Sequence, residues 1–157
     1  MTVVDDHPPP SAETAAAARE ALGAWLADAG EYPMVDEVVR DATPGSQRWF
    51  LRVLGEAKGV WSLWVDVRQR SLHFETYFTP APERNPAQFY EHLLVRNRTT
   101  GGVAFCLGEE HAVFLRARMP LEHVAADALD QLLGEFYVAV EDAFGAAVRL
   151  GFAKPGS

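Results

Sequence analysis

The chain has 157 residues, 48% of them hydrophobic, and its 22 acidic and 14 basic side chains leave a net charge of −8. This length favours one domain with a substantial core, and the negative charge argues against binding of nucleic acid or of an anionic membrane. The single cysteine, Cys106, excludes an intramolecular disulfide and a cysteine-type zinc site, and the lack of a signal-peptide pattern or a membrane-length apolar run predicts a cytoplasmic protein.

The N-terminal part of the sequence predicts a tail followed by a helix. Residues 1–10 are expected to form a disordered tail, because three consecutive prolines can neither donate backbone hydrogen bonds nor continue a helix. Ser11 is a suitable N-cap for an alanine-rich helix over residues 11–30, which carries apolar side chains at helical spacing. The next segment, Val35–Val39, is compatible with either a short helix or a short strand, and Pro44–Gly45 ends it with a turn.

Five strand-like runs alternate apolar and polar residues, and the short links between neighbours favour antiparallel hairpins. These runs cover residues 47–56, 60–69, 71–80, 103–108 and 111–119. The alternation assigns one set of side chains to the core, with Leu51, Leu63 and Phe74 among them. The other set faces outward.

Two further helices complete the pattern. Asn85 is the predicted N-cap of a helix over residues 86–97, whose apolar stripe contains Phe89, Leu93 and Leu94. A long helix is predicted over residues 121–150. The order is therefore helix, three strands, helix, two strands, helix, which predicts an α+β fold with an antiparallel sheet packed on helices. We expect one domain over residues 11–152 and a frayed tail over residues 153–157.

The outward-facing side of the strands combines aromatic and arginine side chains, which protein–protein interfaces enrich. The sequence therefore predicts that this face can bind a protein partner. Two other interpretations remain open: another part of the same chain covers the face, or the face is solvated and its aromatic residues are scattered. The predicted partner-binding residues are Arg52, Trp64, Tyr77, Phe114, Arg116 and Arg118.

His73 and Glu75 are the residues that could indicate an enzyme. In a strand they point to the same side with Cβ atoms roughly 7 Å apart, within reach of one metal ion or one substrate. A zinc site needs three or four ligands, however, and none of the other histidines forms an H-x-x-x-H or H-E-x-x-H pair. Cys106 has no adjacent base to activate it, and no phosphate-binding glycine loop is present. We therefore predict no catalytic residue, no metal and no cofactor.

Several segments resemble the YbjN family in its actinobacterial form. They are RWFLRVLGEAKGVWSLW (48–64), LHFETYFTPAPERN (72–85), YEHLLVRN (90–97) and MPLEHVAADALDQLLGEFYVAVEDAF (119–144), and the resemblance covers residues 14–152. It implies a sensory transduction regulator whose fold is similar to that of type III secretion chaperones. The family has no established catalytic residues, so the resemblance transfers none to this chain.

Together these observations predict a non-enzymatic protein-interaction or regulatory module with a secretion-chaperone-like fold, with a role in signal transduction or stress regulation. The alternative is a small-molecule-binding or metal-binding protein or enzyme centred on His73 and Glu75. We also expect a homodimer that uses the aromatic residues of the sheet, because four aromatic side chains with arginine neighbours could form the centre of an interface.

Overall fold

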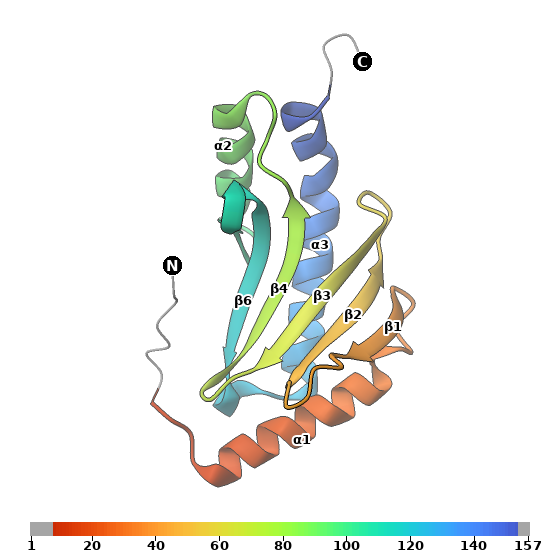
Figure 1. Ribbon diagram of the computed structural model, residues 1–157, viewed down its shortest axis with the longest axis vertical. Coiled ribbons are helices and arrows are strands. Elements are labelled where there is room, and N and C mark those ends of the chain that lie inside the picture. Colours follow the sequence, from red (N-terminus) through yellow and green to blue (C-terminus); the bar gives the residue numbers. More distant parts are fainter. Residues whose placement is uncertain (1–7, 154–157) are drawn as a thin grey trace.

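The computed structural model of the chain describes residues 8–153, and it contains six strands and three α-helices (Figure 1). Most of the two predicted tails therefore lies outside the described residues. The elements in chain order are α1 (Ala12–Ala29), β1 (Val35–Arg40), β2 (Arg48–Leu54), β3 (Val60–Val67), β4 (Ser71–Thr79), α2 (Pro86–Arg96), β5 (Ala104–Leu107), β6 (Val113–Pro120) and α3 (Ala126–Gly151), with 3-10 turns at Glu109–His111 and Leu121–His123.

The strands form one sheet in the order β1-β2-β3-β4-β6-β5, and every neighbouring pair is antiparallel. The predicted α+β class and the antiparallel sheet are thus confirmed. The open segment around Val35–Val39 is a strand, β1, so four strands precede α2 where the sequence predicted three. A register irregularity between Val35 and Glu37 interrupts the alternation of β1, which explains why its periodicity was ambiguous.

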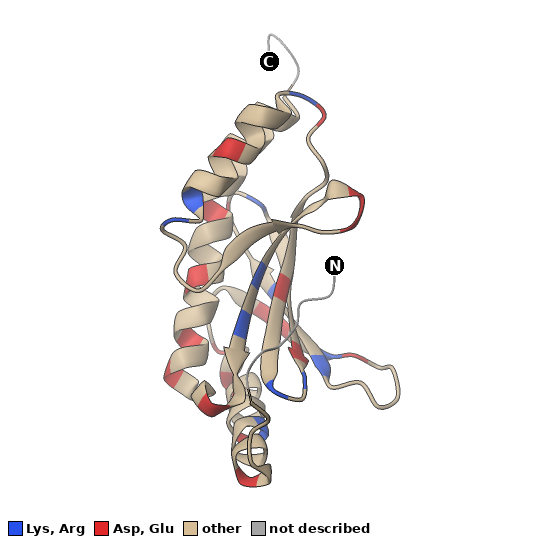
Figure 2. Cartoon of the chain, turned by 90° about the vertical axis from the view of Figure 1, so that its left-hand side faces the viewer, with Lys and Arg blue, Asp and Glu red and all other residues tan. Residues whose placement is uncertain are grey.

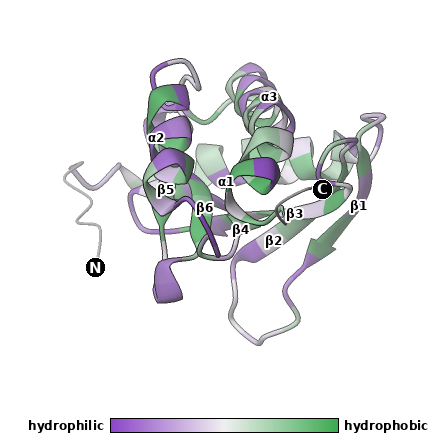
Figure 3. Ribbon diagram, turned by 90° about the horizontal axis from the view of Figure 1, so that it is seen from above, coloured by the Kyte–Doolittle hydropathy of each residue, from purple (hydrophilic) through white to green (hydrophobic). Residues whose placement is uncertain are grey.

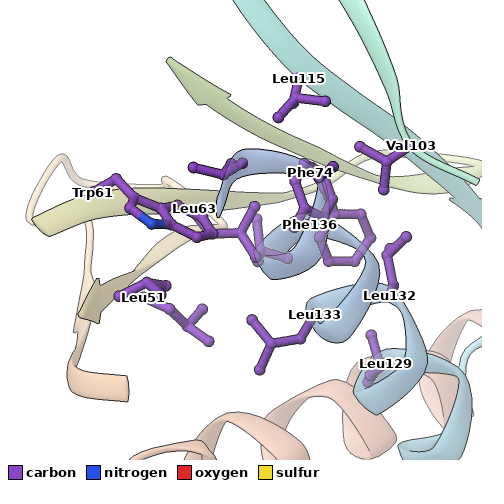
Figure 4. Packing of buried hydrophobic residues seen from close by; sticks show 14 of the residues in the cluster. Leu51, Trp61, Leu63, Phe74, Val103, Leu115, Leu129, Leu132, Leu133 and Phe136 are labelled. Carbon is purple, nitrogen blue, oxygen red and sulfur yellow. The ribbon is translucent and has the colours of Figure 1, made fainter. Parts of the chain in front are cut away.

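The helices gather on one side of the sheet, and the opposite side carries none (Figures 1 and 3). Side chains of α3 point into the sheet, where Leu129, Leu132, Leu133 and Phe136 meet Leu51, Leu63, Phe74 and Leu115 (Figure 4). Leu51, Leu63 and Phe74 are at most 3% exposed, as the alternation predicted. This apolar layer is the main stabilising feature of the domain.

Two details of the helices differ from the prediction. Asn85 occupies the N-cap position of α2 in a left-handed conformation (φ 50°), but its side chain does not cap the helix. Its amide donates instead to the carbonyl oxygen of Leu150, 2.9 Å away, which ties the preceding turn to the end of α3. The last helix begins at Ala126 and not at residue 121, because the extended backbone of Val124 and Ala125 separates it from the 3-10 turn Leu121–His123. The backbone N–H of Leu121 donates to the Arg70 carbonyl (3.1 Å), which ties this turn to the β3–β4 hairpin.

A hydrogen-bonded cluster fastens α1 to α3. The indole Nε1 of Trp25 donates to the Asp130 carboxylate at 2.8 Å, and the Tyr32 hydroxyl donates to the same oxygen. These bonds favour the charged carboxylate, so the hydrogen bonds from Tyr32, and then from Trp25, lower the pKa of Asp130. The Asp130 carboxylate on α3 therefore holds two donors, one in α1 and one just after it, that lie 105 and 98 positions earlier in the chain.

The Asp130→Asn variant is expected to lose less stability than the wild type when the pH is lowered. The pKa of Asp130 is lower in the folded protein than its ordinary value near 3.8, so its charged form stabilises the fold above that pH. This contribution disappears as the pH falls through the folded-state pKa. Urea unfolding of wild type and Asp130→Asn should therefore differ at pH 7 and converge as the pH falls below 3.8. Asp142→Asn, which changes an exposed carboxylate on the same helix, is the control, and an identical effect there would contradict this role.

Candidate functional site: the outer face of the sheet

The side of the sheet that faces away from α2 and α3, here called the outer face, is open along β2, β3, β4 and β6 (Figure 1). Cross-strand register arranges its side chains in rows. One row contains Phe50, Trp64, Glu75 and Arg116, and the next contains Arg48, Asp66, His73 and Arg118. Tyr77 and Phe114 are also directly opposite each other. Strand pairing therefore brings together residues that lie up to 70 positions apart in the sequence.

Arginine side chains and neighbouring rings cover most of the aromatic surface of the outer face. The Phe50 and Trp64 ring centres are 4.8 Å apart, and the guanidinium of Arg48 lies 4.0 Å from the Trp64 ring centre. Tyr77 packs edge-on against Phe114 at 5.5 Å. Tyr77 is 45% exposed, whereas the other three rings are half-buried. The rings of these pairs are tilted or edge-on to each other, and they present apolar surface beside cationic groups.

A hollow of about 510 Å³ lies between the polar rows of the outer face. Four arginines line it together with two carboxylates, which leaves a formal charge of +2 in a chain whose net charge is −8. The Nε of Arg116 lies 2.7 Å from a Glu75 oxygen, and the Nε of Arg68 lies 3.1 Å from Asp66. Acidic side chains follow the long helix α3 instead (Figure 2). The outer face is thus locally basic.

The six predicted partner-binding residues fall into one group and one outlier. Trp64, Tyr77, Arg116 and their neighbours Phe114 and Arg118 lie together in the middle of the outer face. Arg52 lies toward the β1 side of the sheet, where its Nε is 3.6 Å from Asp36. No other element of residues 8–153 lies over the central group. One interpretation left open by the sequence, that another part of the same chain covers this face, therefore does not hold for the described residues.

The His73–Glu75 pair belongs to the same face. Glu75 forms an ion pair with Arg116, and Nε2 of His73 lies 3.0 Å from the Ser71 hydroxyl. Within residues 8–153, no group of three or more His, Cys, Asp or Glu side chains is placed to hold a metal ion. Cys106 is half-buried, and burial raises the pKa of its thiol, which disfavours the reactive thiolate.

Comparison with known proteins identifies the family. A family model described as "Putative bacterial sensory transduction regulator" matches residues 18–148. The chain belongs to the YbjN family. Uncharacterized proteins of Mycobacterium tuberculosis and Mycobacterium bovis are each 34% identical over 98 residues, which are 62% of this chain and 54% of the relative. One from Mycobacterium leprae is 31% identical over 108 residues, 69% of this chain and 59% of the relative. The YbjN chain thus spans somewhat more than half the length of these curated relatives.

Solved structures show that this YbjN chain has a type III secretion chaperone-like fold. A chain of the heterodimeric ExoU–SpcU complex from the type III secretion system of Pseudomonas aeruginosa aligns with a TM-score of 0.55 and 19% identity, covering 82% of this chain and 96% of that one. A chain of the HopA1–SchA chaperone–effector complex gives 0.53 and 11%, covering 85% and 100%. The Yersinia pestis chaperone SycH with a fragment of YscM2 gives 0.52 and 12%, covering 80% and 98%. At these identities the likeness concerns the fold alone.

One group of polar contacts in the YbjN chain has no counterpart in the sequence prediction. The β3–β4 ladder covers Trp64–Val67 and Leu72–Glu75, and beyond it the two strands diverge (Figure 1). Side chains occupy this opening: the Lys58 ammonium donates to the carbonyls of Tyr77 (2.9 Å) and Phe78 (2.8 Å). Burial lowers the pKa of Lys58 to about 8. In the sequence Lys58 lies in a short hairpin link, where a lysine is expected to be solvent-exposed. No sequence signal therefore indicates that it bonds to the carbonyls of β4.

Among the residues described, no helix combines the length and the apolar character that a membrane span requires.

Proposed function

We propose that this YbjN chain is a non-enzymatic protein-interaction module of the cytoplasm that binds a segment of a partner protein on its outer face and acts in regulation. The observation that carries the proposal is the open, locally basic face on which Trp64, Tyr77 and Phe114 lie among arginines. The family description and the fold shared with chaperones solved in complex with proteins support it.

The chemistry of the outer face favours a partner segment that carries both carboxylates and apolar side chains. The net positive charge of the hollow complements acidic groups, and a guanidinium has five N–H donors, of which the Glu75 ion pair occupies the Nε of Arg116. The exposed part of Tyr77 and the neighbouring Phe114 ring offer the apolar contact. Aromatic and arginine side chains of this kind dominate binding energy at protein interfaces.

Affinity capture from the native cytoplasm tests the proposal. The untagged or minimally tagged wild type should enrich a specific protein that the double variant Trp64→Ala with Arg116→Ala does not. Loss of a central aromatic and an arginine anchor is expected to weaken binding by about 2 kcal/mol or more, which is more than tenfold. Val138→Ala, on the helical side of the domain, is the matched control and should retain the partner. If the double variant captures the same proteins as the wild type, the outer face is not the binding surface.

A further inference from the structure

The hollow of the outer face concentrates positive charge in a chain that is acidic as a whole. The arginines that line it come from β2, from the residue that follows β3 and from β6, and they are Arg48, Arg68, Arg116 and Arg118. Two carboxylates share the hollow with them, so a formal charge of +2 remains there, whereas the whole chain carries −8. Like charges that are held close together repel one another. Binding of an anion between these arginines is therefore favoured.

The two ion pairs in the hollow orient their arginines through one nitrogen each. Nε of Arg68 donates to Asp66 at 3.1 Å, and Nε of Arg116 donates to Glu75 at 2.7 Å. The terminal amino groups of each guanidinium take no part in these two hydrogen bonds. The Arg68 and Arg116 side chains are 57% and 41% exposed, so a ligand can reach them from solvent. Each carboxylate thus holds an arginine in place and leaves the outer end of its guanidinium for a ligand.

An aromatic ring holds Arg48 at the border of the hollow. The Arg48 guanidinium lies 4.0 Å from the Trp64 ring centre, a contact that uses its flat face and not the N–H donors in its plane. Arg48 and Arg68 also line a second hollow, to which Arg19 of α1 contributes. The positive charge therefore continues from the outer face toward α1.

We propose that the hollow of the outer face binds a phosphoryl group on a side chain of the partner segment, so that phosphorylation of the partner controls its binding. The inference rests on the proposed function and names the chemistry of the bound segment. A phosphorylated side chain carries a charge of about −1.5 to −2 at pH 7 and three acceptor oxygens, whereas a carboxylate carries −1. One such group matches the +2 of the hollow, and guanidinium groups bind phosphate oxygens in pairs.

The surroundings of the hollow favour a protein segment as the source of the phosphoryl group. Tyr77 lies two positions after Glu75 on β4, and Phe114 lies two positions before Arg116 on β6, so this aromatic pair is roughly 7 Å from the ion pair on the same face. An extended segment that runs along these strands can place its phosphoryl group in the hollow. It then brings the side chain two positions away over Tyr77 and Phe114. We therefore expect an apolar residue at that position of the partner.

Charge disfavours two other occupants of the hollow. The chain as a whole is strongly negative, and acidic side chains follow α3 (Figure 2), so a long nucleic acid is repelled outside the hollow. A second copy of the chain that docked face to face would set this positive hollow against an identical one. The same repulsion opposes the homodimer through the sheet aromatics that the sequence led us to expect.

Fluorescence anisotropy with synthetic peptide libraries tests the inference. Three libraries share degenerate flanking positions and differ at the central residue, which is phosphoserine, serine or aspartate. The phosphoserine library should bind the full chain at least about tenfold more tightly than the serine library, with aspartate in between, and added salt should weaken it. Equal binding of the three libraries would overturn the inference. Inorganic phosphate or a single-stranded DNA oligonucleotide that binds as tightly as the phosphoserine library would also overturn it, because the occupant would then not be a protein segment.

Arginine variants locate the site. Arg48→Gln with Arg68→Gln lowers the formal charge of the hollow from +2 to zero and should weaken binding of the phosphoserine library at least about tenfold. The matched control, Arg98→Gln with Arg149→Gln, removes two exposed arginines that do not line the hollow and should retain the affinity. Arg48→Lys with Arg68→Lys keeps the charge but removes the paired donors, so binding should still weaken several-fold. Full affinity in the lysine variant would show attraction by charge alone and would contradict a phosphoryl site. Circular dichroism melting checks that each variant is folded.

Phosphatase treatment of the cytoplasmic extract separates this inference from the proposed function. Affinity capture by the wild type should enrich the partner from untreated extract and lose it after the treatment. A partner that is captured equally from both extracts, and lost in Trp64→Ala with Arg116→Ala, would overturn the phosphoryl site and leave the proposed function standing. A partner that this double variant still captures would instead contradict the proposed function, and the inference would fail with it.

Discussion

Replacing Phe136 by alanine is expected to lower the free energy of unfolding by about 3–5 kcal/mol. The Phe136 side chain is 0% exposed, and its ring centre lies 6.3 Å from that of Phe74 on the sheet. Figure 4 shows it in the middle of the layer between α3 and the strands. The substitution removes the transfer free energy of the ring and leaves a cavity that surrounding side chains fill only in part. Because domains of this size are stable by roughly 5–15 kcal/mol, the loss is a large fraction of the total.

Urea unfolding followed by circular dichroism measures this effect. Val138→Ala is the matched control, because Val138 lies two residues further along α3 and is 56% exposed, so its free energy of unfolding should change by no more than about 0.5 kcal/mol. If Phe136→Ala is too unstable to purify, Phe136→Leu fills part of the cavity and should show a smaller loss in the same direction. A loss below about 1 kcal/mol for Phe136→Ala would contradict the packing of α3 on the sheet.

The core was predictable from the sequence because its signal is local. Alternation along β2, β3 and β4 assigns Leu51, Leu63 and Phe74 to one side, and the helical period of α3 assigns Leu132 and Phe136 to the facing side. Each assignment needs only a few neighbouring residues. The same rule identified the outer-face residues as members of one surface, without knowledge of how the strands pair.

The errors arise where tertiary contacts override a local pattern. Asn85 has the residue type of an N-cap, but its amide bonds to the end of α3, 65 residues away. Leu121–His123 form a separate 3-10 turn whose first N–H bonds to Arg70, and extended backbone at Val124 and Ala125 precedes the last helix. Leu94 satisfies an apolar period by residue type and nevertheless lies on the exposed side of α2. None of these partners is visible within a window of neighbouring residues.

The geometry of the outer face could not be predicted from the sequence for the same reason. The ion pair between Glu75 and Arg116 requires β4 to pair with β6, and α2 and β5 come between these strands in the chain. The position of Arg48 over the Trp64 ring depends on the β2–β3 register. Residue type predicted which side chains share the face, whereas strand order and register determine which of them touch.

Gly55→Ala is expected to destabilise the fold by about 1–3 kcal/mol, because the β2–β3 hairpin packs too closely on α3 to admit a side chain. A Cβ at this position would overlap with Glu141 Oε1 and would lie 2.9 Å from both the Gly59 carbonyl oxygen and Trp61 Nε1. The Glu141 carboxylate cannot simply move aside, since its other oxygen accepts a hydrogen bond from the Ala57 N–H at 2.5 Å. Gly134→Ala is the control of opposite sign: its Cβ would meet no atom within 4 Å, so alanine should stabilise α3 by about 0.5–1 kcal/mol.

A double-mutant cycle with Glu141→Ala separates the two obstacles at Gly55. Glu141→Ala alone should destabilise the fold by about 1–3 kcal/mol, because it removes the acceptor for the Ala57 N–H. In the Glu141→Ala background the carboxylate no longer blocks the new methyl group, so Gly55→Ala should then have a smaller effect. The remaining effect reports the Gly59 carbonyl and the Trp61 indole, which stay in place. Two losses that add within about 0.5 kcal/mol would show that the Glu141 carboxylate does not obstruct a side chain at position 55.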